Sequence, residues 1–432
     1  MSTRFRSTRS PSGGTVTFTE ALFQGLAKDG GLFEPVTVPQ LPAGWSAETT
    51  FPELAHAVLA NWLGDLELGE GTFEALVHGA FDFPVPLTEL PDDRWLLELH
   101  HGPTLAFKDF GARFMARVMD ALLERAGRRL TIVVATSGDT GSAVADGFAG
   151  LPNTDVVLLY PEGRVSPLQE LQLTVERPGV RALKVAGTFD DCQRMAKAVL
   201  ADAQVQARGV SSANSINIGR LLPQQLYYLW AVRLLEDRTG EAVRPLFSVP
   251  SGNLGNLTAG VYATLSGMPA GGFIAAHNDN DWFPRWLAGE ARTGEFPATR
   301  QTISNAMDVG APSNFERLHA LGDRLDGLVS GYGIGEEATL SRIRRSAAED
   351  GIIACPHTAV GLEAVELQRA NGPAVPTVIL ATAHAAKFPE VVGRAVPDVD
   401  LNVPALSGLS NAATAVTGIE ASDAALKDYL LG

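Results

Sequence analysis

Short apolar runs alternate with helical stretches from about residue 89 to residue 381, and this alternation limits the possible folds more than any other feature of the sequence. The runs are rich in Val, Ile and Leu, which is typical of strands buried on both faces. Buried strands separated by helices predict an α/β fold with a largely parallel sheet, in which ligands bind at the carboxyl ends of the strands. The expected strands are residues 95–99, 130–135, 155–160, 180–185, 246–249, 273–276 and 377–381, and the expected helices include 189–203, 219–237 and 357–370.

Two parts of the chain lie outside this alternating region. Residues 1–88 form an expected first unit, in which Thr19 is predicted to cap a short helix and apolar periodicity returns over residues 51–63. Residues 81–86 are expected to close that unit as an extended connection. The tail, residues 401–432, is rich in Ala and Leu and predicts a final helix.

Charge and metal-ligand content exclude several classes of protein. The net charge of −15 argues against a surface for nucleic acid or for anionic membranes, so an anionic substrate would need a local positive pocket. Cys192 and Cys355 are far apart, which predicts neither a disulfide framework nor a metal site. His100 and His101 are adjacent, so they are expected to point apart and to make a poor metal pair. No apolar run has the length of a membrane span, and we expect a cytoplasmic protein without a bound metal.

Lys108 is the first residue with a predicted chemical role. It follows the expected strand at 95–99, and a helix is predicted just after it because apolar residues recur every fourth position from Phe110. The apolar residues 105–107 make the amine costly to charge, so its pKa is expected to fall. A neutral amine is a nucleophile, and its usual partner is a carbonyl group, with which it forms a Schiff base. The alternative from this stretch alone is an ordinary lysine at a helix start whose amine reaches water.

A first turn of small polar residues follows the expected strand at 130–135. It contains Thr136, Ser137, Asp139 and Thr140, together with two glycines. Such a turn exposes backbone N–H groups at a helix N-terminus and can bind a carboxylate or a phosphate. The alternative is a helix start that is simply capped by Asp139 or Thr140.

A second turn of this kind follows the expected strand at 246–249. Its glycines allow the backbone to approach an anion closely, and its asparagines can add amide donors. It lacks the lysine of a Walker A loop and does not match the dinucleotide-binding fingerprint. Two anion-binding turns and a desolvated lysine in one open sheet are a more specific combination than any of the three alone. The residues of this second turn are Gly252, Asn253, Leu254, Gly255 and Asn256.

Other polar residues at strand ends and helix starts extend the candidate site. Asn214 and Ser215 precede Arg220, whose fixed guanidinium fork suits a phosphate group, although a solvated surface arginine is the alternative. Thr382 ends the last strong strand and is placed to point its hydroxyl into a strand-end pocket. His384 could act as an acid or base, with a packed histidine as the alternative.

Eight stretches match the motifs of one family, in the family's order and over nearly the whole chain. In these stretches the sequence resembles the threonine synthase family, in the longer form that is typical of many bacteria and fungi. This family belongs to fold type II of the pyridoxal-phosphate enzymes. The stretches are Gly-Leu-Ala-Lys-Asp-Gly-Gly-Leu-Phe at 25–33, His-Gly-Pro-Thr-Leu-Ala-Phe-Lys-Asp-Phe at 101–110, Ala-Thr-Ser-Gly-Asp-Thr-Gly at 135–141, Ser-Pro-Leu-Gln-Glu at 166–170, Asn-Ser-Ile-Asn at 214–217, Val-Pro-Ser-Gly-Asn-Leu-Gly at 249–255, Ser-Asn-Ala-Met-Asp-Val at 304–309 and Thr-Ala-His at 382–384.

The resemblance implies an architecture. Fold type II consists of two open, mostly parallel α/β lobes with the cofactor between them. The resemblance implies an N-terminal domain at 1–88, a catalytic region at 89–400 with a smaller lobe at about 130–225, and a C-terminal tail at 401–432. Relatives of this type are monomers or homodimers.

The resemblance also implies a role for each candidate residue. Lys108 would bind pyridoxal 5'-phosphate as a Schiff base and move protons on the substrate. The turn from Gly252 to Asn256 would hold the cofactor phosphate, Thr382 would face the pyridine nitrogen, and Asp139 would lie near the ring hydroxyl. The substrate groups would bind elsewhere: the carboxylate at Thr136, Ser137 and Thr140, and the phosphate at Asn214, Ser215 and Arg220.

The implied reaction is the conversion of O-phospho-L-homoserine and water to L-threonine and phosphate. It proceeds by γ-elimination of phosphate and β-addition of water, with the cofactor as electron sink. One alternative is a threonine or serine dehydratase on the same scaffold, which would not need Arg220 because its substrate carries no phosphate. Another is a non-catalytic homologue that only binds the cofactor, which would not need Lys108. A Ser/His/Asp hydrolase is disfavoured because the chain has no G-x-S-x-G turn between a strand and a helix.

Overall fold

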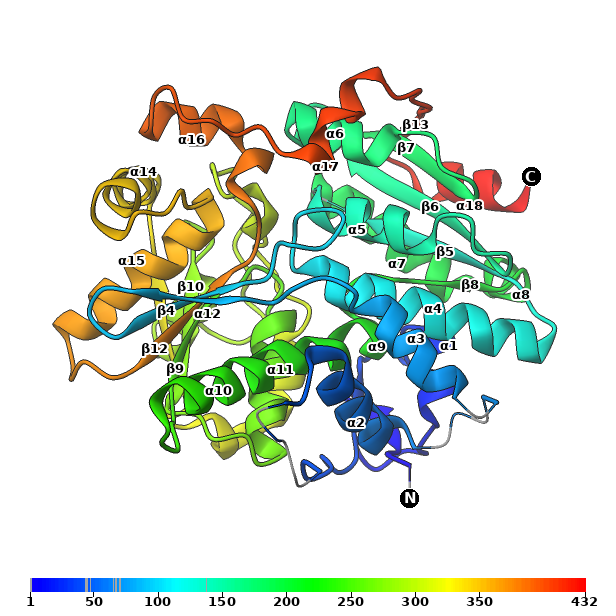
Figure 1. Ribbon diagram of the computed structural model, residues 1–432. Coiled ribbons are helices and arrows are strands. Elements are labelled where there is room, and N and C mark those ends of the chain that lie inside the picture. Colours follow the sequence, from blue (N-terminus) through cyan, green and yellow to red (C-terminus); the bar gives the residue numbers. More distant parts are fainter. Residues whose placement is uncertain are drawn as a thin grey trace.

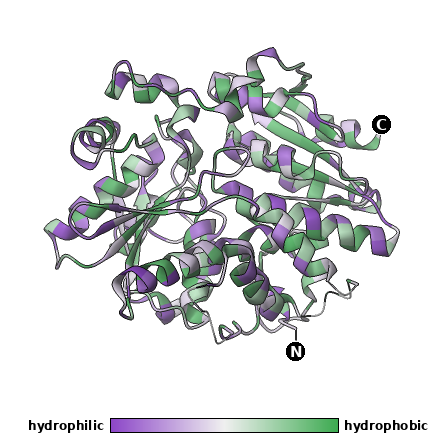
Figure 2. Ribbon diagram, in the orientation of Figure 1, coloured by the Kyte–Doolittle hydropathy of each residue, from purple (hydrophilic) through white to green (hydrophobic). Residues whose placement is uncertain are grey.

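Two open sheets, each covered by helices, form the two lobes of the molecule (Figure 1). The computed structural model describes residues 2–42, 46, 48–64, 66, 68–69, 71–136 and 138–432. The strands are mainly hydrophobic, and the helices that cover them carry mixed polar and apolar residues (Figure 2). This arrangement follows from the sequence pattern, because apolar strands are stable only between covering helices.

The larger lobe contains a six-stranded sheet. Its strand order is β11-β10-β9-β12-β4-β3, and all neighbouring strands are parallel except β3 and β4. Helix α15 packs against β9, β10 and β12, and most of its buried residues are apolar. The strands are β3 (Leu87–Leu90), β4 (Arg94–Glu98), β9 (Leu246–Pro250), β10 (Gly272–His277), β11 (Val329–Gly333) and β12 (Thr377–Ala381). The helices are α10 (Leu226–Thr239), α11 (Gly255–Leu265), α12 (Trp282–Leu287), α13 (Phe315–Ala320), α14 (Glu336–Arg345), α15 (Pro356–Ala370) and α16 (Pro389–Ala395).

The smaller lobe contains a five-stranded, fully parallel sheet with the order β13-β7-β6-β5-β8. Its edge strand β13 comes from the C-terminal tail, and α18 packs beside it against α7. The strands are β5 (Leu130–Ala135), β6 (Thr154–Pro161), β7 (Val180–Ala186), β8 (Val210–Ser211) and β13 (Thr417–Glu420). The helices are α4 (Lys108–Ala126), α5 (Asp139–Phe148), α6 (Pro167–Thr174), α7 (Phe189–Ala201), α8 (Ala203–Ala207), α17 (Pro404–Ser407) and α18 (Asp423–Leu431).

The N-terminal part packs under both lobes (Figure 1). It consists of β1 (Phe5–Ser7), α1 (Phe18–Gln24), β2 (Phe33–Pro35), α2 (Phe51–Leu63) and α3 (Thr72–Ala80), with β1 and β2 antiparallel. The predicted cap of α1 at Thr19 is wrong. Thr17 caps the helix instead, because its hydroxyl accepts from the backbone N–H of Glu20 while the Glu20 carboxylate accepts from the backbone N–H of Thr17.

The seven predicted strands are confirmed, and so is the α/β fold with two mostly parallel sheets. The predicted helix at 219–237 is wrong as a single element. It divides into α9 (Ile218–Leu221), the 3₁₀-helix η1 (Leu222–Gln225) and α10, since Pro223 has no N–H to continue an α-helix. The remaining short helical turns are η2 (Asn305–Met307), η3 (Gly322–Leu325), η4 (Ser346–Asp350), η5 (Ala385–Lys387) and η6 (Leu409–Asn411). Over the described residues, no helix is both long enough and apolar enough to span a membrane.

Candidate active site

A cavity of about 110 Å³ lies where the two lobes meet, at the carboxyl ends of their strands. Its wall includes residues from both lobes and from the segment around α9. Most of the predicted site residues line it, so residues far apart in the sequence come together there. Those lining residues are Lys108, Thr136, Asp139, Thr140, Asn214, Ser215, Arg220, Gly252, Asn253, Gly255, Asn256 and Thr382.

Lys108 is the first residue of α4, and its half-buried side chain lines the cavity. The Nζ atom is 4.7 Å from the centre of the Phe107 ring, and among the described residues no hydrogen bond or ion pair holds it. Burial lowers the pKa of Lys108 to about 8, the charge of Asp139 opposes this shift, and the charges of Lys387 and Arg220 add to it. A useful fraction of the amine is therefore neutral near pH 7, as a nucleophile or base requires.

The turn before α11 offers a set of free backbone donors. The backbone N–H groups of residues 252–256 donate to no acceptor within the described part of the chain. Leu254 has a φ of 60°, and a Cβ on Gly252 would lie 2.8 Å from the Cα of Met307. Side-chain bonds from Ser251 to Asn256 and from Asn253 to Ser215 hold the loop in this shape. Consecutive free donors at the N-terminus of an 11-residue helix can bind a phosphate.

The turn before α5 is built around Thr136. Its hydroxyl accepts from the backbone N–H groups of Gly138 and Gly141, while the N–H groups of Asp139 and Thr140 have no acceptor among the described residues. Neither Asp139 nor Thr140 caps the helix through its side chain, so the simple capping alternative is wrong. Ser137 lies outside the described residues.

Asp139 forms an ion pair that the sequence did not predict. Its Oδ1 lies 2.8 Å from the Nζ of Lys387, and Gln169 donates to the same oxygen at 3.2 Å. Burial would raise the pKa of the Asp139 carboxyl, but the positive charges of Lys387 and Lys108 outweigh it and hold that pKa well below its usual range. Lys387 follows the last motif, three residues after His384, and that place in a strand-end segment was the available signal.

Arg220 is a buried cation that forms no ion pair among the described residues, although the charge of Asp109 acts on it. One Nη donates to the carbonyl of Ala213, and Nε has no hydrogen-bond partner within that same part of the structure. Only 1% of its surface is exposed, and burial lowers its pKa to about 10. The surface-arginine alternative is therefore wrong, and the buried charge calls for an external anion.

The neighbours of Arg220 in the cavity wall are held by their own hydrogen bonds. The Asn214 amide donates to the carbonyl of Ala135 at 2.7 Å, which fixes it to the end of β5. The Ser215 hydroxyl accepts from the Asn253 amide at 2.6 Å. These two bonds tie the Asn214–Arg220 segment to both anion-binding turns.

Histidines around the cavity have mainly structural contacts. Thr382 lines the cavity as expected, but His384 does not, and its Nδ1 accepts from the backbone N–H of Ala386. His357, which the sequence did not single out, does line the cavity, and its Nε2 accepts from the backbone N–H of Ala306. Burial lowers the pKa of His357 to about 4, so its ring is neutral at physiological pH.

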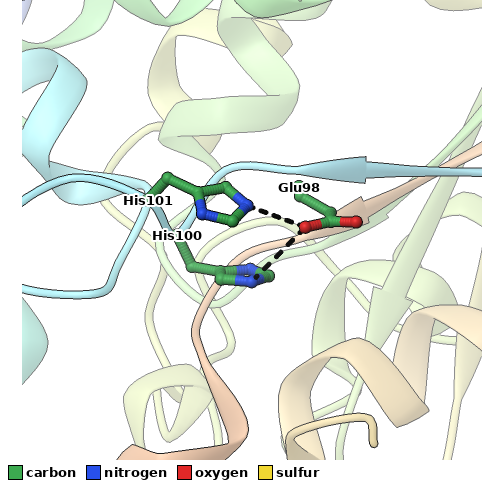
Figure 3. Close-up of side chains that lie close together, drawn as sticks. All are labelled: Glu98, His100 and His101. Carbon is green, nitrogen blue, oxygen red and sulfur yellow. Dashed lines mark hydrogen bonds and ion pairs between the residues drawn. The ribbon is translucent and has the colours of Figure 1, made fainter. Parts of the chain in front are cut away.

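His100 and His101 do not point apart. Their rings stack 4.8 Å apart, and both face Glu98, with His101 at 2.7 Å and His100 at 3.9 Å (Figure 3). The expectation was wrong because β4 ends at Glu98, and side chains alternate only within a strand. Although the three ligand atoms lie within 4.8 Å of one another, Glu98 already accepts from His101 and from Thr88 at 2.6 Å. We interpret the cluster as hydrogen-bonded support for the loop before Lys108.

Comparison with known proteins agrees with this geometry. Residues 83–382 match the model of the pyridoxal-phosphate dependent enzyme family, residues 4–81 match the threonine synthase N terminus, and residues 358–430 match the threonine synthase C-terminal region. The chain is 41% identical to the threonine synthase of Haemophilus influenzae over 383 residues, which cover 88% of each protein.

Solved structures give the same result. The crystal structure of threonine synthase from Escherichia coli matches with a TM-score of 0.90 and 37% identity over 99% of both chains. The pyridoxal-phosphate-bound threonine synthase from Brucella melitensis matches with a TM-score of 0.87 and 35% identity over 99% of this chain and 98% of that one. On fold, on sequence and on the lysine-centred cavity between two lobes, this chain belongs to the threonine synthase family of pyridoxal-phosphate-dependent enzymes.

Proposed function

We propose that this enzyme is a carbon–oxygen lyase that acts on a phosphate ester, converting O-phospho-L-homoserine and water to L-threonine and inorganic phosphate. The assignment of the substrate rests on Arg220, a buried guanidinium that forms no ion pair among the described residues and lines the same cavity as Lys108. A substrate with a phosphate would supply the missing negative charge. A dehydratase substrate has no phosphate and would leave that charge uncompensated.

The cavity residues fit pyridoxal phosphate. The cofactor has an aldehyde, a ring hydroxyl, a ring nitrogen and a phosphate, and each has a suitable partner in the wall. The free N–H groups of residues 252–256 suit the phosphate, and the amine of Lys108, which no described residue binds, suits the aldehyde. Thr382 would lie at the ring nitrogen and Asp139 near the ring hydroxyl.

Each wall residue then has a task in the reaction. Bound pyridoxal phosphate supplies an electron sink that stabilises negative charge at the substrate's α carbon. Lys108 Nζ would take the proton from Cα and then from Cβ, because its pKa near 8 suits proton transfer at neutral pH. The free N–H groups of Asp139 and Thr140 would hold the substrate carboxylate. Arg220, with Asn214 and Ser215, would hold the phosphate while it leaves from Cγ.

An assay with purified protein tests this proposal. Threonine and inorganic phosphate should form together, in equal amounts, from O-phospho-L-homoserine and only with pyridoxal phosphate bound. The variant Lys108→Ala should lose turnover by several orders of magnitude, because it removes the amine that would bind the cofactor and move the protons. Lys197 also lines the cavity, but it lies in α7 and not at the start of α4. Oxoacid formation from threonine or serine without phosphate release would identify a dehydratase, and cofactor binding without turnover of either substrate would identify a binding homologue.

The finer properties stay predictions of the sequence. We infer a cytoplasmic enzyme that is a monomer or homodimer, with an N-terminal domain at 1–88, a catalytic region at 89–400 and a tail at 401–432. Light scattering on the holoenzyme would give the oligomeric state, and limited proteolysis would test the boundaries.

A further inference from the structure

A buried ion pair joins the two lobes beside Lys108. Lys387 Nζ lies 2.8 Å from Asp139 Oδ1 and donates to the carbonyl of Thr104 at 2.9 Å. Asp139 begins α5 of the smaller lobe, whereas Lys387 and Thr104 lie in segments that follow β12 and β4 of the larger lobe (Figure 1). The two side chains are 0% and 3% exposed. A buried pair of this kind is costly to break, because removing one partner leaves the other charge uncompensated.

A second contact between the lobes holds the same oxygen of Asp139. Gln169, in α6, donates through Nε2 to Asp139, and its Oε1 accepts from Nδ2 of Asn305 at 2.9 Å. The contact is close, since a Cβ on Gly138 would lie 2.5 Å from the Gln169 side chain. The position of the Asp139 carboxylate is therefore fixed by residues of both lobes.

The Asp139–Lys387 pair lies in the electrostatic environment of Lys108. Lys108 and Asp139 line the same cavity, and among the described residues five titratable groups from four elements act on the Lys108 amine or are acted on by it, with Asp139 as the carboxylate among them. The charge of Lys387 also acts on the buried carboxylate of Asp109, which accepts from the backbone N–H and the hydroxyl of Thr104. Burial raises the pKa of Cys355 and lowers that of His357, so both are neutral at physiological pH. The groups are Asp139 in α5, Arg220 in α9, Cys355 and His357 at the start of α15, and Lys387 in η5.

We propose that Lys387 is a positioning residue that acts on Lys108 through Asp139, by fixing that carboxylate across the lobes and balancing its charge. The nitrogen of Lys108 then lies beside a neutral ion pair rather than beside a bare carboxylate. Without Lys387, Asp139 would favour a proton on that nitrogen. Without Asp139, the uncompensated ammonium group of Lys387 would disfavour it. This inference rests on the proposed attachment of the cofactor to Lys108.

The test is the pH dependence of the visible absorption of the bound cofactor in the holoenzyme, which reports the proton on the nitrogen that Lys108 supplies. Lys387→Met should raise the pH midpoint by at least about one unit, and Asp139→Asn should lower it by a similar amount. The double variant Lys387→Met/Asp139→Asn should return the midpoint close to that of the unchanged enzyme, because both charges are gone. Lys387→Arg keeps the charge and should also stay close to it. A residue that only supported the fold would not give opposite shifts that cancel.

Two controls make the outcomes distinct. Lys427→Met removes another ion pair, to Asp202 at 2.7 Å, but Lys427 lies in α18 and not in the cavity wall, so the midpoint should not move. An unmoved midpoint in Lys387→Met, or a double variant whose midpoint stays shifted, overturns the role of Lys387. If Lys387→Met does not retain the cofactor, the double variant and Lys387→Arg still test the proposal. Their midpoints should stay close to that of the unchanged enzyme, whereas the midpoint of Asp139→Asn should be lower. A pH-dependent cofactor band that persists in Lys108→Ala would instead overturn the proposed cofactor site itself.

Discussion

At the scale of single residues, the site works by placing charges where water cannot screen them. Lys108 and Arg220 are both basic residues that line one cavity, and the carboxylate that acts on Lys108, Asp139, is already paired with Lys387. Burial alone would make an ammonium group costly, so Lys108 gives up its proton more readily than a lysine in water. Arg220 cannot do so at neutral pH and stays charged, which leaves it available for an anion. The same burial therefore suits one side chain to act as a base and the other to bind an anion, as we propose.

The lowered pKa of Lys108 predicts how fast the cofactor-free protein takes up pyridoxal phosphate. Only the neutral amine attacks the aldehyde, so below pH 8 the rate should rise about tenfold per pH unit, and it should level off above about pH 9. Stopped-flow absorbance across this range measures the profile. A rate that still rises tenfold per unit at pH 10 would mean that the amine has an ordinary lysine pKa.

The same shift predicts a pH-dependent stability for the cofactor-free protein. Between about pH 8 and pH 10.5 the unfolded chain holds a proton on Lys108 that the folded chain has lost, so this residue's contribution to the free energy of unfolding increases with pH across that window. Urea unfolding at several pH values, with Lys108→Ala as the matched variant, isolates the contribution. The difference between the two proteins should change in this window and stay constant below it.

At the scale of elements, the strands that form the site could be predicted and its edges could not. Strands such as β5 and β12 are continuous apolar runs whose burial the sequence shows directly, and the turns after β5 and β9 follow from their glycines and small polar residues. Strand β13, Thr-Gly-Ile-Glu, is mostly exposed and extended only because it pairs with β7, so no local pattern marks it. Lys387 was missed for a similar reason, because its partner Asp139 lies far away in the sequence and meets it only when the lobes pack.

The turn before α11 allows a prediction at this scale. In Gly252→Ala the new Cβ would lie 2.8 Å from the Cα of Met307 and 3.1 Å from a methyl group of Val309, and the Met307 backbone cannot move aside as a side-chain end could. The turn itself should shift and misalign its free N–H groups, which should weaken binding of pyridoxal phosphate about tenfold or more, as the loss of one or two good hydrogen bonds would. Equilibrium binding followed by cofactor fluorescence measures this change.

Gly393→Ala is the matched control for that variant. Gly393 lies inside α16, and a Cβ there would meet nothing within 4 Å. Alanine should be neutral there or stabilising by up to about 1 kcal/mol, with unchanged cofactor affinity. Equal affinity in both variants would contradict the assignment of the 252–256 turn to the cofactor phosphate.

At the scale of the whole molecule, the two lobes line the cavity, and the N-terminal part supports it from outside. The larger lobe supplies Thr382 and the turn before α11 to the cavity wall, while the smaller lobe supplies the turn before α5. The N-terminal part supplies no lining residue of the cavity among those described, yet it contacts the segment that carries Ser215 and Arg220. Its contribution to function should therefore be indirect, through the position of that segment. Arg317 is the residue through which this idea can be tested.

Arg317, in α13, connects all of these parts from a fully buried position. Its Nε donates to the carbonyl of Phe33 in β2 at 2.9 Å, and its two Nη groups donate to the carbonyls of Ile216 at 2.6 Å and Ser215 at 3.4 Å. Methionine would fill much of the same volume but could donate to none of these carbonyls, and among the described residues only that of Ser215 would keep another donor, the Asn314 amide at 3.3 Å. Arg317→Met should therefore lower the free energy of unfolding by about 2–4 kcal/mol. It should also raise the KM for O-phospho-L-homoserine more than it lowers kcat, because the segment proposed to bind the phosphate loses its anchor while Lys108 is untouched.

Arg292→Met is the control, since that side chain is 86% exposed and pairs only weakly with Glu295. The effect of Arg292→Met on the free energy of unfolding should stay within about 0.5 kcal/mol. Urea unfolding and steady-state kinetics on both variants give the two quantities. Lost stability with an unchanged KM would show that the N-terminal part supports the fold without positioning the phosphate-binding segment.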